Sequence, residues 1–375
     1  MTATFGEPTP PPDTTPSNAS SEPGTDQPSP DVVVDFSSPA KPTGLKQVHD
    51  IIPAHCYERS TWRGVSLIVR DVAVYALATA GLIATNNPLL LIPLWILSGL
   101  AVSGLFVLGH DAAHDALFDS KRANAITGRL TMLPSLHATE IWIFGHNRVH
   151  HGHTLKQGMD FVWHPLTTEE YLSLGRFGRL RHRIEWGPVG SGLYYGRNVW
   201  WNKMIRFTPP PRWAKVMRRD QLFVGLFALG TLVAAVGFQG GPGVWTWIKA
   251  VLIPFAIFCQ TIGWVVHVHH IHPDIRWWPR REWNRYRGQV EGTTVFRGPP
   301  GMELFFHWIM VHLPHHVDMR IPCYRLQEAA EAIEEHFPED VEEKRLSPSN
   351  YLAAVRICKL HDFSTGTWLP YPASS

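Results

Sequence analysis

Histidine is the residue type whose number and spacing in this sequence point most directly to chemistry. The chain has 21 histidines among 375 residues, and thirteen of them fall in four short clusters. Imidazole nitrogens are common ligands of Zn, Cu, Fe and Ni, so the clusters predict metal binding. They consist of His110 and His114; His146, His150, His151 and His153; His267, His269, His270 and His272; and His312, His315 and His316.

The spacing inside the clusters suits side chains that converge from several helices. A helix turns about 100° per residue, so His110 and His114 lie about 40° apart on one face. Three or four such helices would gather about eight or nine nitrogens, which is too many for one ion and fits a pair of ions. Each cluster alone could be a helix cap or a polar loop at the lipid headgroups, but four together favour a metal site.

Motifs that are missing narrow the choice of metal. The zinc motif HExxH and the Glu-x-x-His pair of soluble di-iron bundles are both absent from the sequence. The four cysteines are scattered without a CxxC and none accompanies a cluster, which excludes a disulfide scaffold and a thiolate metal site. An all-histidine site beside an apolar scaffold favours iron and oxygen chemistry on an apolar substrate.

Four apolar segments are long enough to position these clusters at a membrane. A bilayer-spanning helix needs about 20 mainly apolar residues, and we predict such helices at about 65–85, 88–109, 221–238 and 244–266. Residues 88–109 contain no charge, whereas Arg70 and Asp71 weaken the first segment. The competing interpretation is a set of buried helices in a large soluble core.

The connecting segments predict that all four clusters lie on one side of the membrane. Asn86-Asn87 and residues 239–243 contain no Lys or Arg, whereas residues 110–220 contain sixteen of the 34. Basic loops stay on the cytoplasmic side, so we expect cytoplasmic termini and a cytoplasmic helical cap made of residues 110–220 and 267–365. The expected fold is an all-α, multi-pass integral membrane protein whose domain spans residues 46–365.

Composition adds two further expectations. Residues 1–45 contain ten of the 31 prolines, and such a stretch buries too little apolar surface to offset its ordering entropy, so we predict a disordered tail. The tail is an interaction segment or a tolerated extension. The net charge of +2 excludes a protein that coats nucleic acid. The mean hydropathy of −0.09 averages tail, membrane helices and cap, and therefore hides the membrane segments.

The order of the motifs resembles that of the membrane-bound fatty-acid desaturases, closest to the delta-12/omega-3 acyl-lipid branch. The three histidine boxes of that family are represented here by HDAAH, HNRVHH and HLPHH. Between the last two boxes the sequence continues with HHIHP, EW and RG, and after the last box it reads IPCYRLQEA. The resemblance covers roughly residues 65–335 and implies four membrane helices with a cytoplasmic helical cap that holds a di-iron centre.

The resemblance also implies which histidines bind the two iron ions, box by box. His270 matches the family's histidine after the last membrane helix, with His272 in reserve, while His267 and His269 have weaker claims. The second box here is HxxxHH, one residue longer than the usual HxxHH, so a π-type irregularity is expected, or His153 replaces one ligand. The implied ligands are His110, His114, His146, His150, His151, His270, His312, His315 and His316.

Carboxylates near the boxes are candidates to orient the imidazoles by accepting their remaining N–H. Asp160 is the preferred candidate, and Asp111, Asp115 and Asp318 are weaker ones. The reaction implied by the resemblance is O2-dependent removal of two hydrogens from a fatty acyl lipid or acyl thioester among membrane lipids. No HPGG-type haem-binding segment occurs in the sequence, so a separate ferredoxin or cytochrome is the expected electron donor.

Two other classes of function compete with desaturation. The same scaffold could hydroxylate or ketolate alkanes, acyl chains or carotenoids, since hydroxylation begins with the same hydrogen abstraction. A non-enzymatic haem electron carrier or metal-binding membrane protein is the second alternative. A haem carrier would place histidine pairs within facing membrane helices, whereas these clusters sit at helix ends and beyond.

Overall fold

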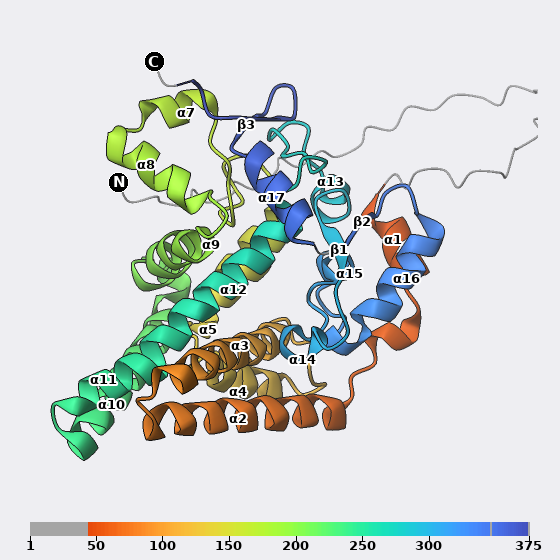
Figure 1. Cartoon of the computed structure of the whole chain (residues 1–375). Helices are drawn as coiled ribbons and strands as arrows, with labels where there is room; N and C mark the ends of the chain where they lie inside the picture. The colour runs from red at the N-terminus through yellow and green to blue at the C-terminus, as the bar shows by residue number, and fades with distance from the viewer. Residues whose placement is uncertain (1–43, 346, 374–375) are drawn as a thin grey trace, which may run out of the picture. The chain divides into compact units, whose positions relative to one another are not determined.

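A computed structural model describes residues 44–345 and 347–373, and this part of the chain is mostly helical (Figure 1). The predicted tail, residues 1–45, lies outside the described residues except for its last two positions. The division into tail, membrane domain and cap therefore stays a prediction. The chain before the first membrane helix contains α1 (Leu45–Ile51) and η1 (Ala54–Tyr57).

Four helical segments are long and apolar enough to cross a membrane, as expected from the sequence. Each extends a few residues beyond at least one predicted bound, and two of them run directly into the first and third histidine clusters. The segments are α2 (Thr61–Ala84), α3 (Pro88–Ala113), α10 (Ala214–Gln239) and the continuous run of α11 (Pro242–Trp247), η5 (Ile248–Leu252) and α12 (Ile253–His270).

Local sequence signals set the ends of these helices. The Ser60 hydroxyl accepts a hydrogen bond from the Arg63 backbone N–H at 3.3 Å and caps α2. Asn87 caps α3 by accepting from the Leu89 N–H at 3.0 Å, with a proline at the first helical position. Gly240 ends α10 with a φ of 64°, a conformation that glycine adopts without steric cost.

The first membrane helix contains a buried charge that is fully partnered. Asp71 is 3% exposed, and its Oδ2 lies 2.6 Å from Nε2 of His307, which is also buried. Arg70 binds the same carboxylate and donates to the Leu304 carbonyl at 2.6 Å. Paired charges are tolerated in apolar surroundings where an isolated one is costly, which is why the least apolar segment still forms a long helix.

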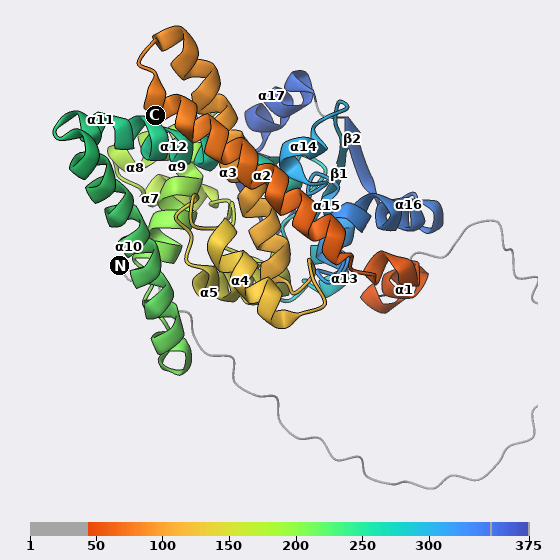
Figure 2. The same ribbon diagram turned by 90° about the horizontal axis from the view of Figure 1, so that it is seen from below.

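The centre of the bundle consists of α3 and α12, which cross in close contact. Their apolar windows are 56% and 44% buried, against 6% for α10, which lies at the rim of the bundle in Figure 2. Gly99 makes the crossing possible, because a Cβ there would lie 2.4 Å from Cγ2 of Ile257. Phe106 packs edge-on against Trp142 and Phe258 in the adjoining core.

The segment between α3 and α10 is a series of short helices, two of them π-helices. It folds against the end of the bundle at which α3 and α12 carry their histidines. Its elements are α4 (Lys121–Thr131), α5 (Thr139–Trp142), η2 (Ile143–His150), α6 (His151–His153), α7 (Thr168–Ser173), α8 (Arg176–Glu185), α9 (Ser191–Tyr194), η3 (Tyr195–Ile205) and η4 (Pro211–Trp213).

The region after α12 corrects the expectation of an all-α chain, because it contains two small sheets. β1 (Thr294–Arg297) pairs in parallel with β2 (Glu342–Arg345), and β3 (Leu360–Asp362) pairs antiparallel with β4 (Thr367–Leu369). These strands are too short to signal themselves by alternation. The helices of this region are α13 (Arg285–Gln289), α14 (Glu303–Phe306), α15 (His312–Val317), η6 (Cys323–Arg325), α16 (Leu326–His336) and α17 (Pro348–Ile357).

Gly263 lies where α12 crosses α9, and the crossing leaves no room for a side chain. A Cβ there would lie 2.4 Å from the Ser191 backbone oxygen. We expect Gly263→Leu to overpack the crossing by about 1–3 kcal/mol and to lower the Tm measured by scanning fluorimetry in detergent. Gly230 of α10 has no atom within 4 Å of its Cβ position, so Gly230→Leu should leave the Tm unchanged. Equal Tm values for the two variants would contradict this packing.

Candidate metal centre

The end of α3 supplies the first two histidines of the centre. His110 lies in the last turn and His114 caps the helix, so the i, i+4 spacing puts both rings on one face. Their Nε2 atoms are 3.3 Å apart, and both side chains are buried. The predicted convergence on one face therefore holds for this pair.

The second cluster lies on the π-helix η2 and the short helix α6 that follows it. The His151 backbone N–H donates to the His146 carbonyl, five residues earlier, which is the π-helical pattern. This wider turn accommodates the extra residue of HxxxHH and is the local irregularity expected from the spacing. The His146 and His151 rings come together, with Nε2 atoms 3.1 Å apart, and His146 Nε2 lies 2.7 Å from that of His110.

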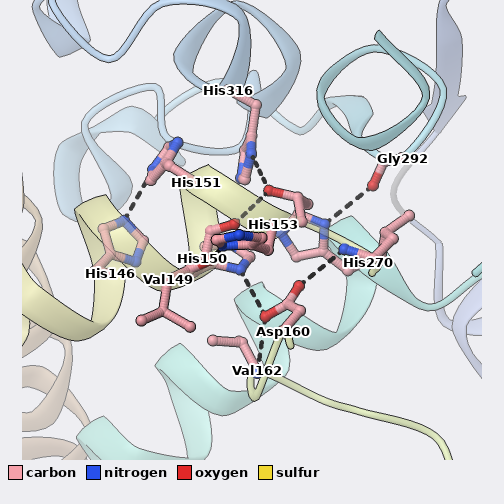
Figure 3. A network of polar contacts seen from close by, with 12 residues as sticks. His146, Val149, His150, His151, His153, Asp160, Val162, His270, Gly292 and His316 are labelled. Carbon is pink, nitrogen blue, oxygen red and sulfur yellow. Dashed lines mark hydrogen bonds and ion pairs between the residues drawn. The ribbon is translucent and has the colours of Figure 1, made fainter. Parts of the chain in front are cut away.

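The remaining rings come from α15 and from the end of α12. His312 and His316 share one face of α15, and their Nε2 atoms are 3.0 Å apart. The His270 ring lies 4.9 Å from that of His316 and 5.0 Å from that of His150, measured between ring centroids. Figure 3 shows His150, His270 and His316 facing one another from three separate elements.

All nine predicted ligands meet in two neighbouring groups. Within each group the potential ligand atoms lie within 4.8 Å of one another, and every member is buried. His151 and His316 stack at 4.4 Å between ring centroids and join the two groups. We call them the five-histidine group (His110, His114, His146, His151 and His315) and the four-histidine group (His150, His270, His312 and His316).

The other histidines of the clusters lie outside both groups. The His269 ring stacks on His312 at 4.1 Å, and His267 packs edge-on against Trp163. His153 donates to the Val149 carbonyl, and His272 accepts from the Asp274 backbone N–H. The structure therefore brings neither reserve candidate, His153 or His272, into the centre.

The arrangement fits metal ions. Two imidazole nitrogens bound at right angles to one ion, each at ~2.0–2.1 Å, are about 3 Å apart, and the Nε2–Nε2 distances of 2.7–3.3 Å match this. In the described part of the chain, neither ring nitrogen of His315 has a hydrogen-bond partner, although the side chain is buried. Buried polar atoms are normally satisfied, so these nitrogens are suited to a metal.

The imidazoles are held in the neutral form that binds metals. Burial, and then repulsion from the neighbouring rings, keep the pKa of six of them well below the usual value for histidine. A neutral ring leaves one nitrogen lone pair free for an ion. The six are His114, His146, His151, His312, His315 and His316.

Asp160, the carboxylate preferred from the sequence, lies in hydrogen-bond contact with a histidine of the second cluster. Its Oδ1 accepts from His150 Nδ1 at 3.0 Å (Figure 3), and its Oδ2 accepts from the Leu155 backbone N–H. Burial opposes ionisation of this carboxyl, but its interaction with His150 and its backbone hydrogen bond outweigh that effect, so the pKa of Asp160 is lowered. The carboxylate therefore fixes the His150 ring with Nε2 turned toward the other histidines.

The three other carboxylates considered have different roles. Asp111 accepts from the Cys323 backbone N–H at 2.6 Å, and it is 3.7 Å from His110 Nδ1, too far for a hydrogen bond. Asp318 binds Arg320, and Asp115 is exposed. Spacing along the chain could place these acids near the boxes but could not show which way they face.

Two further groups orient the rings and were missed by sequence reasoning. The Gln289 Oε1 accepts from His316 Nδ1 at 2.8 Å, and the Gly292 carbonyl accepts from His270 Nδ1 at 3.0 Å. The only signal for Gln289 was its position directly after the RG pair of the family pattern. A backbone carbonyl such as that of Gly292 leaves no signal in a sequence.

An apolar cavity reaches the histidines from inside the helical bundle. Tyr195 closes part of it, and its hydroxyl lies 3.0 Å from Nε2 of the buried His137. Members of both histidine groups line the cavity, so an apolar ligand there would touch both. The lining consists of Phe106, Val107, His110, Trp142, His146, His150, Val162, Tyr195, Val199, Ile262, Val265, Val266, His270, Ile309 and His312.

Comparisons with known proteins agree with this site. The family described as fatty acid desaturase matches residues 86–345. The sn-1 oleoyl-lipid 12-desaturase of Anabaena variabilis is 29% identical over 339 residues, which cover 86% of this chain and 91% of that protein. The chloroplastic omega-6 fatty acid desaturase of Brassica napus is 32% identical over 78% of this chain and 65% of its own length. The sn-1 oleoyl-lipid 12-desaturase of Synechocystis is 28% identical over 80% of this chain.

The lowered histidine pKa values predict how the stability of the metal-free protein depends on pH. Unfolded histidines take up protons below a pKa of about 6.5, whereas the buried ones stay neutral. The unfolded state then binds more protons, so the free energy of unfolding should decrease as the pH falls from about 7.5 to about 5.5. Scanning fluorimetry of chelator-treated protein should show a falling Tm. A constant or rising Tm over this range would contradict the neutral buried rings.

Proposed function

Since the chain belongs to the fatty acid desaturase family, we propose that it introduces a double bond at the delta-12 position of a lipid-bound oleoyl chain. It is a membrane oxidoreductase of lipid metabolism. The names of the Anabaena and Synechocystis relatives support the substrate and the position. The observation that carries the proposal is that members of both histidine groups line one apolar cavity.

The nine histidines are proposed to hold two iron ions, one in each group. Bound iron would supply the O2-activating chemistry that removes one hydrogen from each of two adjacent methylenes. In the balanced reaction, the saturated bond, O2, two electrons and two protons give the double bond and two waters. The protein's share is to hold neutral imidazoles at the ions, to fix their orientation through Asp160, Gln289 and the Gly292 carbonyl, and to keep water away.

Positioning of the acyl chain is the second task of these residues. The cavity walls Phe106, Val265 and Ile309 can bury methylenes and exclude water from them. The methylenes beside His110 and His150 would be the ones oxidised, because both rings line the same cavity. The depth to which the chain enters would then set the position of the new double bond.

The proposed topology places both termini, the cap and the metal centre on the cytoplasmic side. The basic residues of segment 110–220 and the uncharged turns at the other ends of the helices support it. Electrons are proposed to come from a separate ferredoxin- or cytochrome-type protein, and the substrate from the surrounding lipids.

The hydroxylase alternative differs in its product and not in its first step. The names of the relatives favour desaturation. Expression in a host with defined lipids, followed by mass spectrometry of its fatty acids, tests the proposal. A diunsaturated chain with a new delta-12 bond is the expected product, and a new hydroxyl group without a double bond would reject the proposal.

His315→Ala is expected to abolish product formation in that host while the protein remains in the membrane. Among the described residues, neither ring nitrogen of His315 has a hydrogen-bond partner, and the residue belongs to the five-histidine group. His336→Ala is the matched control, because His336 is exposed at the end of α16 and should leave the fatty-acid profile unchanged. Substantial desaturation by His315→Ala, at wild-type protein level, would show that the group does not bind the catalytic metal.

Asp160→Asn is expected to weaken iron binding without displacing the histidines. Loss of a carboxylate that orients a metal-binding histidine typically costs about 10- to 100-fold in metal affinity. Asp115→Asn is the control, since Asp115 flanks His114 but is exposed. Iron would be measured by mass spectrometry after dialysis against a graded series of chelators. We expect two irons per wild-type chain, and retention equal to wild type in Asp160→Asn would remove the assigned role of the carboxylate.

A further inference from the structure

The loop after α12 is attached directly to the second histidine cluster. The Trp278 backbone N–H donates to the Leu155 carbonyl at 3.0 Å, and the Gln157 N–H donates to the Trp278 carbonyl at 2.9 Å. Leu155 follows the cluster by only a few residues. The loop thus lies against the outer side of the metal centre, at the opposite end of α12 from α11, where Figure 1 shows α13.

Trp283 of this loop lies at the protein surface and is linked to the histidines by hydrogen bonds through one residue, Thr154. Its partly exposed indole donates to the Thr154 carbonyl at 2.8 Å. The Thr154 hydroxyl in turn donates to the His150 carbonyl at 2.7 Å and lies 3.3 Å from His316 Nδ1. Gly288 permits this approach, because a Cβ there would lie 2.7 Å from the Thr154 oxygen and 2.9 Å from the indole nitrogen.

Positive charge is concentrated around this tryptophan. Lys156 lies over the Trp283 ring at 4.6 Å, and Trp278 is held between Arg276 and Arg287 at 4.2 and 4.1 Å. Together with three neighbouring arginines, these basic residues form what we call the loop basic surface: Lys156, Arg276, Arg280, Arg281, Arg285 and Arg287. Among the residues that the structure describes, only Arg276 of the loop basic surface forms a salt bridge, with Glu282.

The loop basic surface has the character of a protein-docking site and not of a lipid-binding one. Residues 253–303, all described, include no exposed large apolar side chain that could enter a bilayer. The arginine-rich helix α8 is different, since Phe177 and Leu180 project beside its arginines with 72% and 56% of their surface exposed. Charge without apolar side chains favours an acidic protein surface as the partner.

We propose that the loop basic surface docks an acidic one-electron carrier protein above Trp283, and that electrons pass from there to the metal centre. The inference rests on the proposed function, because desaturation consumes two electrons for each O2. Two reduced carriers would each lose one electron, and these electrons, with two protons and the two hydrogens of the acyl chain, reduce O2 to two waters. Contacts through Thr154 link this surface to His150 and His316 within the described chain.

The test is a charge reversal at two of the three exposed arginines of the loop basic surface that make no salt bridge in the described chain, Arg281→Glu with Arg285→Glu. The matched control reverses the same charge on α4 by Lys121→Glu with Arg122→Glu, both exposed. Iron-loaded enzyme in neutral phosphatidylcholine nanodiscs is titrated with an acidic plant-type [2Fe–2S] ferredoxin, and Kd is measured without turnover. We expect the loop variant to raise Kd about 10-fold or more at low ionic strength, an effect that high salt reduces, and the control to keep the wild-type Kd.

Rapid mixing adds a kinetic readout of the same docking. Reduced ferredoxin should be oxidised more slowly by the loop variant, whereas dithionite, which needs no docking site, should reduce the metal of wild type and variant equally. An unchanged Kd in the loop variant would overturn the proposal, as would an equal loss in the control. Binding of the loop surface to anionic vesicles, lost in the same variant, would reject the protein partner in favour of lipid. Failure of the proposed function would show in the lipid profile and leave the Kd values unaffected.

Discussion

The constraint on which the rest of the structure depends is the burial of nine imidazole rings at one place without a carboxylate among the converging atoms. A buried polar nitrogen without a partner costs about 1–3 kcal/mol, and several of these nitrogens have none in the described chain. Bound metal ions would remove this cost, and metal binding would then be thermodynamically coupled to the ordering of the segments that carry the histidines. The low pKa values of the buried histidines also favour metal binding, because protonated rings could neither pack together nor bind a cation.

The helical bundle meets this constraint by bringing rigid ends to a common point. Both α3 and α12 continue beyond the apolar segment, so His110 and His270 are held by helices that cross closely at Gly99. The second cluster needs a different solution, because three rings on a regular helix at its spacing would diverge. The π-helical turn from His146 to His151 provides it, and Asp160 then fixes the His150 ring.

Much of this organisation was predictable because it depends on the spacing of residues that lie close together in the chain. The four apolar helices, the box histidines, the π-type irregularity and the preference for Asp160 all follow from residues close together in the chain. The rest depends on contacts that local spacing does not encode. Gln289 binds the His151 carbonyl across 138 positions, and Asp71 meets His307 across 236. The direction in which the weaker candidate Asp111 faces was unpredictable for the same reason, since its carboxylate accepts from Cys323 in a distant segment.

The two sides of the histidine groups are lined by different kinds of residue, with hydrogen-bond acceptors on the outer side and apolar side chains on the inner side. On the outer side, Asp160, Gln289 and the Gly292 carbonyl accept from the Nδ1 atoms, which turns the Nε2 atoms inward. On the inner side, the cavity presents Val107, Val265 and Ile309, which offer no polar atom to compete with the histidines or to admit water. Interchanging the two layers would leave the rings unoriented and surround an acyl chain with polar groups. In the proposed reaction, substrate would therefore approach from within the bundle, and electrons from the polar side, where Thr154 and Trp283 lie between the histidines and the surface.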